Sequence, residues 1–212
     1  MINATNETVQ RELTPAGNHI ARCYSMIHIG TIQEEYMGEP KMGNKVRITW
    51  ELPNELRTFK EENGEQPMVI SKEYTLSMHE KSNLRKDLES WRGKGFTEDE
   101  AKEFDITKLL GVPCMLSIIH KVSKSEKQYA TITSIASIPK GMDAPDQVNQ
   151  NFEFNFCDSF SEDNLESFPD FIKEKIKSSV EYIKLTNPNN ENTAANIGGS
   201  SDTPAPEDDL PF

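Results

Sequence analysis

The chain has 212 residues, 35% of them hydrophobic, and a net charge of −12. This length fits one medium-sized domain with extensions or two small domains, and the low hydrophobic content predicts that part of the chain does not fold. No apolar run approaches the ~18 residues of a membrane-spanning helix, and the N-terminus lacks the basic and apolar blocks of a signal peptide. We therefore expect a cytoplasmic protein that does not bind membranes.

The first part of the chain has the patterns of β-strands. Residues 1–16 are polar and are expected to form a flexible N-terminal segment. The next stretch, HIARCYSMIHIGTI, is rich in β-forming residues. KVRITWEL then alternates, with apolar residues up to Trp50 on one face and Lys45 and Arg47 on the other, and Pro53 is expected to end it. We expect strands at residues 19–32, 45–52 and 68–78, with a polar loop at 54–67.

The spacing of apolar residues changes after the third strand. Leu84, Leu88 and Trp91 form one stripe of a helix that Gly93 can end. Thr97 is placed to cap a second short helix, with Glu at the capping-box position. Two more strands, at residues 112–122 and 128–138, are joined by the basic loop SKSEK and are expected to form a hairpin.

Five strands with a helical insert between the third and the fourth are the order of the OB-fold, a small Greek-key barrel that commonly binds oligonucleotides. We therefore predict a mainly β protein with a five-stranded OB-fold barrel at residues 17–140. Trp50 and Trp91 are expected in its core. The three cysteines, Cys23, Cys114 and Cys157, are too few and too far apart for a disulfide framework, so we expect free, buried thiols.

The C-terminal third differs from the barrel in charge. Residues 17–140 contain 18 basic and 18 acidic residues, whereas residues 141–212 contain 15 acids and only 4 lysines. Phenylalanines alternate from Phe152 to Phe156, as in an added strand. An amphipathic helix is expected at 167–185, with its apolar stripe at Phe171, Ile172, Ile176, Val180 and Ile183. We expect an acidic extension at 141–186 and, because the composition cannot support a core, a disordered acidic tail at 187–212.

The chain ends in PEDDLPF, and a disordered terminus rarely exposes apolar residues without a use for them. The tip DDLPF resembles the DDIPF ending of bacterial single-stranded-DNA-binding proteins. The segments ITWELP, YTLSMHEKSNLRKDLESWRGKGFT and FDITKLLGVPCML are similar to a phage-encoded single-stranded-DNA-binding family. The resemblance implies a barrel that binds single-stranded DNA and a tip that recruits replication, recombination and repair enzymes. The longer helical insert and the post-barrel helix depart from the bacterial pattern, so its tetramer is not carried over and the oligomeric state stays open.

The tip has a simple physical logic. Its acids are attracted to basic residues of a partner, while the terminal phenylalanine enters an apolar pocket. The alternative is a tail that docks on its own domain or has no role, and a further hypothesis is that it competes with DNA for the basic groove at low salt. The expected partner-binding residues are Asp208, Asp209, Leu210, Pro211 and Phe212.

Non-specific binding of single-stranded DNA needs cations along a groove and aromatic faces for bases. The final hairpin combines Lys121, Lys124 and Lys127 with Tyr129, and other strands repeat a cation next to an aromatic residue. Tyr24 and Tyr74 fit the core and the DNA site equally well, and the hairpin lysines are solvated in either case. The expected DNA-binding residues are Arg22, Tyr24, Tyr36, Lys41, Lys45, Arg47, Lys72, Tyr74, Arg92, Lys94, Lys121, Lys124, Lys127 and Tyr129.

The sequence contains no phosphate loop, nucleophile elbow, metalloprotease helix or paired zinc-knuckle spacing. We therefore expect no enzyme activity, no cofactor and no metal site. Two further classes stay open: a protein-interaction adaptor on a barrel scaffold, and a nuclease or annealing factor. An adaptor would show no salt-dependent binding to oligonucleotides. A nuclease would leave cleaved DNA, and an annealing factor would leave duplex DNA.

Overall fold

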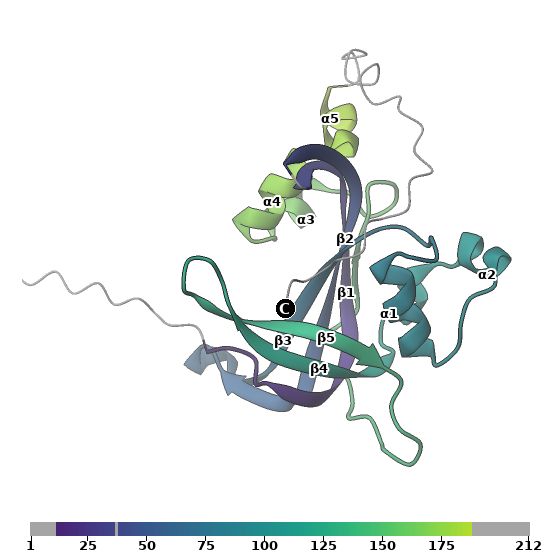
Figure 1. Ribbon diagram of the computed structural model, residues 1–212. Coiled ribbons are helices and arrows are strands. Elements are labelled where there is room, and N and C mark those ends of the chain that lie inside the picture. Colours follow the sequence, from purple (N-terminus) through teal and green to yellow (C-terminus); the bar gives the residue numbers. More distant parts are fainter. Residues whose placement is uncertain (1–11, 37, 188–212) are drawn as a thin grey trace, which may run out of the picture.

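The computed structural model describes residues 12–36 and 38–187 and is mainly β (Figure 1). Five strands form an antiparallel sheet in the order β3-β2-β1-β4-β5, and a short sixth strand pairs with β1. This arrangement, with helices inserted between β3 and β4, is OB-like, and the predicted fold class is confirmed. The strands are β1 (Gly17–Tyr36), β2 (Glu39–Thr58), β3 (Glu65–Thr75), β4 (Pro113–Val122), β5 (Gln128–Ala136) and β6 (Phe152–Phe154).

The main core lies inside the curved sheet. The alternation of β2 turns Val46, Ile48 and Trp50 inward, where each is at most 3% exposed. The Trp50 ring packs against that of Trp91, with their centroids 5.8 Å apart, and Trp91 is 3% exposed. The prediction that both tryptophans belong to the core is confirmed.

Strand β2 does not end at Pro53. It continues to Thr58, so the prediction that Pro53 ends the strand is wrong, and much of the expected loop at 54–67 is strand. The pairing of β2 with β3 shifts register between Leu52 and Leu56. Pro53 lies in this irregular stretch, where the ladder does not need its missing N–H. Between β2 and β3 lies only a short 3-10 turn, η1 (Glu61–Asn63).

The helical insert follows its sequence signals. The Ser82 hydroxyl accepts a hydrogen bond from the amide of Arg85 at the start of α1 (Asn83–Arg92), and Gly93 ends the helix at φ 71°. Helix α2 (Glu98–Glu103) begins with the expected capping box between Thr97 and Glu100. A 3-10 turn, η2 (Ile106–Leu109), leads into β4. Helix α1 is fixed to the barrel by the indole of Trp91, which donates to the carbonyl of Pro113 at 3.0 Å.

The acidic extension packs on the opposite side of β1 from the main core (Figure 1). The alternating phenylalanines predicted an added strand, and β6 is that strand; the structure shows that it pairs with β1 in a parallel direction. The expected single helix is instead two, α4 (Asp170–Lys177) and α5 (Val180–Thr186), because Ser179 caps a new helix by accepting from the amide of Tyr182. Helix α3 (Glu162–Glu166) was not predicted. A second core joins the extension to β1, and its buried members are Ile27, Ile29, Ile32, Phe154, Leu165, Phe168, Ile172 and Ile176.

The three cysteines differ in exposure. Cys23 and Cys114 are free and buried as expected, and burial raises the pKa of the Cys23 thiol to about 12. Cys157 is exposed, so the prediction of burial is wrong for it. It follows β6 in a turn whose amides bond the side chain of Asn155, and this turn keeps residue 157 at the surface.

None of the helices in residues 12–36 and 38–187 is long and apolar enough to cross a membrane. Residues 1–11 of the predicted flexible N-terminal segment lie outside the described residues, and so do residues 188–212 of the predicted disordered tail, including the tip from Asp208 to Phe212. Residues 12–16 are described: Thr14 is 7% exposed, and its hydroxyl donates to the carbonyl of Val69 at 3.4 Å.

Candidate nucleic-acid interface

The β4–β5 hairpin carries a cluster of cations and an exposed aromatic ring. Lys121 on β4 pairs across the hairpin with Tyr129 on β5, so their side chains share one face of the ribbon. Tyr129 is 43% exposed. Lys124 and Lys127 follow in the turn, and both are exposed. We call Lys121, Lys124, Lys127 and Tyr129 the hairpin cluster.

The geometry of the turn keeps Lys124 and Lys127 in the solvent, while Lys121 on β4 is half-buried. The amide of Ser123 donates to the carbonyl of Lys127 at 2.9 Å, and Glu126 takes a left-handed conformation at φ 60° to close the loop. Within the described parts of the chain, none of the three lysine ammonium groups forms an ion pair or a side-chain hydrogen bond. The hairpin cluster therefore presents unneutralised positive charge beside an accessible ring.

A groove of about 320 Å³ brings together a second group of predicted residues. Its lining comes from the end of β1, the start of β2, the end of β3 and the start of α1. Its cations are partly neutralised, because Lys45 lies 2.5 Å from Glu34 and Lys72 lies 2.8 Å from Asp87. The groove also contains Glu35 and Glu73. The predicted residues that line it are Lys41, Lys45, Lys72 and Tyr74.

The tyrosines of β1 and β3 differ in their freedom to meet a base. Tyr74 is 4% exposed, and its hydroxyl donates to Asp87 at 2.7 Å; burial and the Asp87 carboxylate raise its pKa well above the ordinary value. Tyr24 is half-buried, and burial together with the carboxylate of Glu51 raises its pKa. Tyr36 is the last residue of β1, and its side chain lies outside what the structure describes.

The predicted arginines all have contacts within the protein. Arg22 is half-buried and donates to the carbonyls of Pro145 and Gly111, at 2.6 and 2.8 Å. Arg92 stacks over the ring of Phe96, with 3.9 Å from the guanidinium carbon to the ring centroid. Arg47 donates to Glu73 and also lies over a phenylalanine of α4.

Lys94, in the glycine-rich segment after α1, is exposed, and its ammonium lies 3.4 Å from the carboxylate of Glu100. The predicted residues therefore lie in several separate places: the hairpin cluster, the groove over β2 and β3, the β1 strand, and the insert with Arg92 and Lys94. The hairpin cluster combines exposure with unpaired charge.

Sequence reasoning missed two residues beside Arg47. Phe171 was placed in the apolar stripe of the C-terminal helix, but the structure leaves 49% of it exposed. Consecutive residues of a helix point about 100° apart, and the neighbouring Ile172 takes the buried direction. Lys175, on the same helix as Phe171, forms an ion pair with Glu73 on β3, with 2.6 Å between Nζ and Oε2. Phe171 and Lys175 can be identified only from the packing of the extension on the barrel, because the residues that they contact are distant in sequence.

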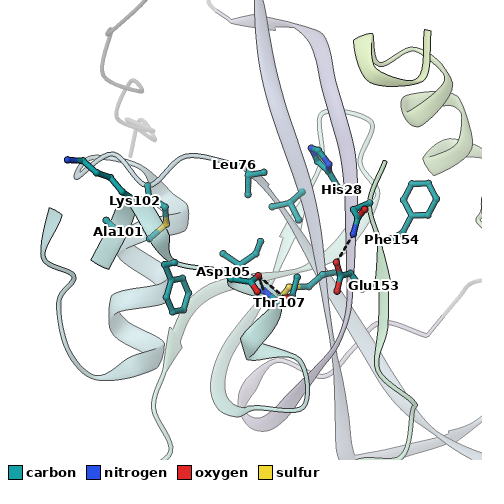
Figure 2. A pocket seen from close by; sticks show the side chains of 14 residues that line it. His28, Leu76, Ala101, Lys102, Asp105, Thr107, Glu153 and Phe154 are labelled. Atoms are coloured by element: carbon teal, nitrogen blue, oxygen red, sulfur yellow. Dashed lines mark hydrogen bonds between the residues drawn. The ribbon is translucent and has the colours of Figure 1, made fainter. Parts of the chain in front are cut away.

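An apolar pocket of about 450 Å³ lies at the upper end of the barrel, between β1, β6 and the segment from α2 to η2. Figure 2 shows Asp105 hydrogen-bonded to Thr107 at one side and Glu153 bonded to Asn155 at the other. None of the predicted DNA-binding residues lines it. Its apolar lining consists of Met26, Val46, Leu76, Met78, Ala101, Phe104, Ile106 and Phe154.

The chain was also compared with known proteins. No protein-family model matches it, and no curated protein matches it either.

Proposed function

We propose that this protein binds single-stranded DNA without sequence preference, and that it acts in phage DNA replication, recombination or repair in the host cytoplasm. The single observation that supports this proposal best is the hairpin cluster, in which three lysines without described partners flank an exposed tyrosine. An OB-like barrel is a common scaffold for this activity, although a fold alone does not determine function.

The chemistry of the cluster fits an unpaired strand. Lysine ammonium groups neutralise phosphates and release counterions, which gives affinity that falls with salt. The ring of Tyr129 offers a stacking surface for any base. Bases are available for stacking only when they are unpaired, so this combination favours single-stranded over double-stranded DNA.

The tip supplies the second half of the proposed function. Residues Asp208 to Phe212 would bind replication and recombination enzymes at surfaces that have basic residues beside an apolar pocket, while the barrel stays on DNA. The long polar segment before the tip would act as a tether that raises the local concentration of these partners.

The decisive test is a titration of fluorescein-labelled oligo-dT and of a matched duplex, followed by anisotropy at several salt concentrations. A labelled oligonucleotide is needed because Trp50 and Trp91 are 0% and 3% exposed and would report binding poorly. We expect tight binding of the single strand, weak binding of the duplex and an inverse dependence on salt. Equal affinity for both forms of DNA would refute the proposal.

The hairpin is tested by the triple variant K121A/K124A/K127A. Three phosphate contacts contribute roughly −2 to the slope of log affinity against log salt for a single strand, and the variant should lose that share. The matched control K81A/K86A/K102A removes the same charge from exposed positions near the helical insert. Unchanged affinity and slope in the first variant would reject the hairpin as the DNA site.

A protein-interaction adaptor is the second candidate. The apolar pocket at the upper end of the barrel favours it, because such a pocket can receive an apolar side chain of another protein. An adaptor would bind neither form of DNA in the titration above.

A further inference from the structure

Phe171 has an unusual position on α4. It is 49% exposed, whereas Ile172 and Ile176 on the same helix are 4% and 0% exposed and belong to the second core. A single exposed apolar side chain is ordinary on a protein surface. Phe171 differs because a cation holds it: the guanidinium carbon of Arg47, on the neighbouring strand β2, lies 5.3 Å from the centroid of its ring.

Arg47 belongs to a small charged cluster with an excess of positive charge. Its Nη1 donates to Oε1 of Glu73 at 3.0 Å, and Nζ of Lys175 lies 2.6 Å from Oε2 of the same carboxylate. Two cations thus share one anion, which leaves one positive charge beside the ring. The side chains of Arg47 and Lys175 are 22% and 38% exposed, so a phosphate can approach both.

The helix that carries Phe171 is fixed to the barrel. Strand β6 pairs with β1 at Ser25–Ile27, and both carboxylate oxygens of Glu181 on α5 accept hydrogen bonds from Thr31 on β1. Ile172 and Ile176 insert into the second core. A ring on such a support is pre-organised, so the protein loses little conformational entropy when a ligand stacks on it.

The cluster also adjoins the groove over β2 and β3, because Glu73 lines that groove and binds both cations. Figure 1 shows α4 and the β4–β5 hairpin extending to the same side of the sheet, on the left in this view.

We propose that Phe171 is a base-stacking residue of the single-stranded DNA site, and that Arg47 and Lys175 bind the phosphates beside the stacked base. This inference rests on the proposed function above and extends it, since it makes the C-terminal extension part of the DNA site. An aromatic face, an adjacent cation pair and a rigid support are the components that sequence-tolerant recognition of unpaired bases requires.

The test uses the full chain and two substitutions at one position. We expect Phe171→Ala to weaken oligo-dT binding about 5- to 150-fold, the range given by the loss of one stacked base. Phe171→Trp should keep the affinity, and its indole emission should be quenched on titration with unlabelled oligo-dT, above the small response of the buried Trp50 and Trp91. Phe59, 60% exposed near the far end of β2, provides the control Phe59→Ala, which should bind like the wild type.

The outcomes separate the two proposals. If the wild type binds single-stranded DNA but Phe171→Ala binds within about twofold and the Phe171→Trp emission does not change, the stacking role is refuted and the proposed function stands. A wild type that does not distinguish single-stranded from double-stranded DNA refutes both. If Phe171→Ala fails to fold by circular dichroism, the Phe171→Trp emission decides alone. A change of oligomeric size in Phe171→Ala without a change in DNA affinity would assign the ring to a protein interface and refute the stacking role.

Discussion

Glu51 anchors the acidic extension to the barrel, and its removal should loosen that attachment. The residue is 0% exposed on β2, and its carboxylate accepts three hydrogen bonds from the extension. They come from the amides of Val148 and Asn149, each at 2.7 Å, and from the side-chain amide of Asn149 at 2.5 Å. Glu51→Ala leaves these three donors without their acceptor.

The size of the effect follows from the environment of the donors. Each buried donor left unsatisfied costs about 1–3 kcal/mol, which sets an upper range for the three together. Val148 is 58% exposed, so water can replace the carboxylate for its amide. We therefore expect Glu51→Ala to lower the free energy of unfolding by roughly 2–4 kcal/mol, a large share of the stability of an ordinary domain.

The assay is urea unfolding followed by tryptophan fluorescence, because Trp50 and Trp91 report the main core. Hydrogen exchange measured in parallel should show faster exchange in residues 141–186 than in the barrel strands. The matched control is Glu55→Ala: Glu55 also lies on β2 but is partly exposed, and its carboxylate lies 3.2 Å from the imidazole of His19, its one polar partner among the described residues, so we expect a loss below about 1 kcal/mol. A loss for Glu51→Ala no larger than for the control would show that the extension does not depend on this carboxylate.

Three further predictions concern the extension and the tip. Burial raises the pKa of Glu181, but hydrogen bonds from Thr31 outweigh it and hold the pKa below the ordinary 4.5; the stabilisation is thus present above that pH and lost as the pH falls through the lowered value. Urea midpoints at a series of acid pH values should show this loss, and Glu181→Gln should be less stable at neutral pH and less sensitive to acid. Gly30 has φ +94°, and a Cβ there would lie 2.7 Å from Oε2 of Glu181 on α5 and 2.7 Å from Cβ of Ser179, which caps that helix, so Gly30→Ala should destabilise the fold by about 2 kcal/mol or more. Gly38→Ala, at φ +83° with no atom within 4 Å of the added Cβ, measures the backbone strain alone, and equal losses for the two variants would contradict the proposed clash. Deletion of Leu210–Phe212 should abolish co-precipitation of replication enzymes from host lysate while leaving the affinity for oligo-dT unchanged, and recruitment that survives the deletion would refute the role of the tip.

Local patterns in the sequence predicted the elements that depend on nearby residues. The alternation around Trp50 identified the inner face of β2, and the spacing of Thr97 and Glu100 identified the start of α2, because both depend on contacts within a few residues. Pro53 misled the prediction, since a proline is compatible with a strand where the ladder is already irregular. The helix break at Ser179 was missed because an amphipathic stripe can continue across a new cap.

The sequence predicted only those parts of the candidate site whose residues lie close together in the chain. The hairpin cluster lies within nine residues of sequence, and its pattern of lysines and tyrosine was visible without the fold. The partners of Arg47 were not, because Phe171 and Lys175 reach it through the docking of a helix more than a hundred residues away. One of the two internal hydrogen bonds of Arg22 depends in the same way on a segment of the extension, at Pro145.

The second core determines how far the chain can be shortened from its C-terminal side and still fold. A fragment that stopped at residue 140 would expose Ile27, Ile29 and Ile32 to water, and each buried side chain of this size is worth about 1.5–3 kcal/mol. Such a fragment would expose a contiguous apolar surface along β1 and would be prone to self-association. The unit that keeps this core covered therefore extends at least to Ile176 on α4, and the hydrogen bonds between Thr31 and Glu181 add α5 to it, even though the barrel itself is complete well before that point.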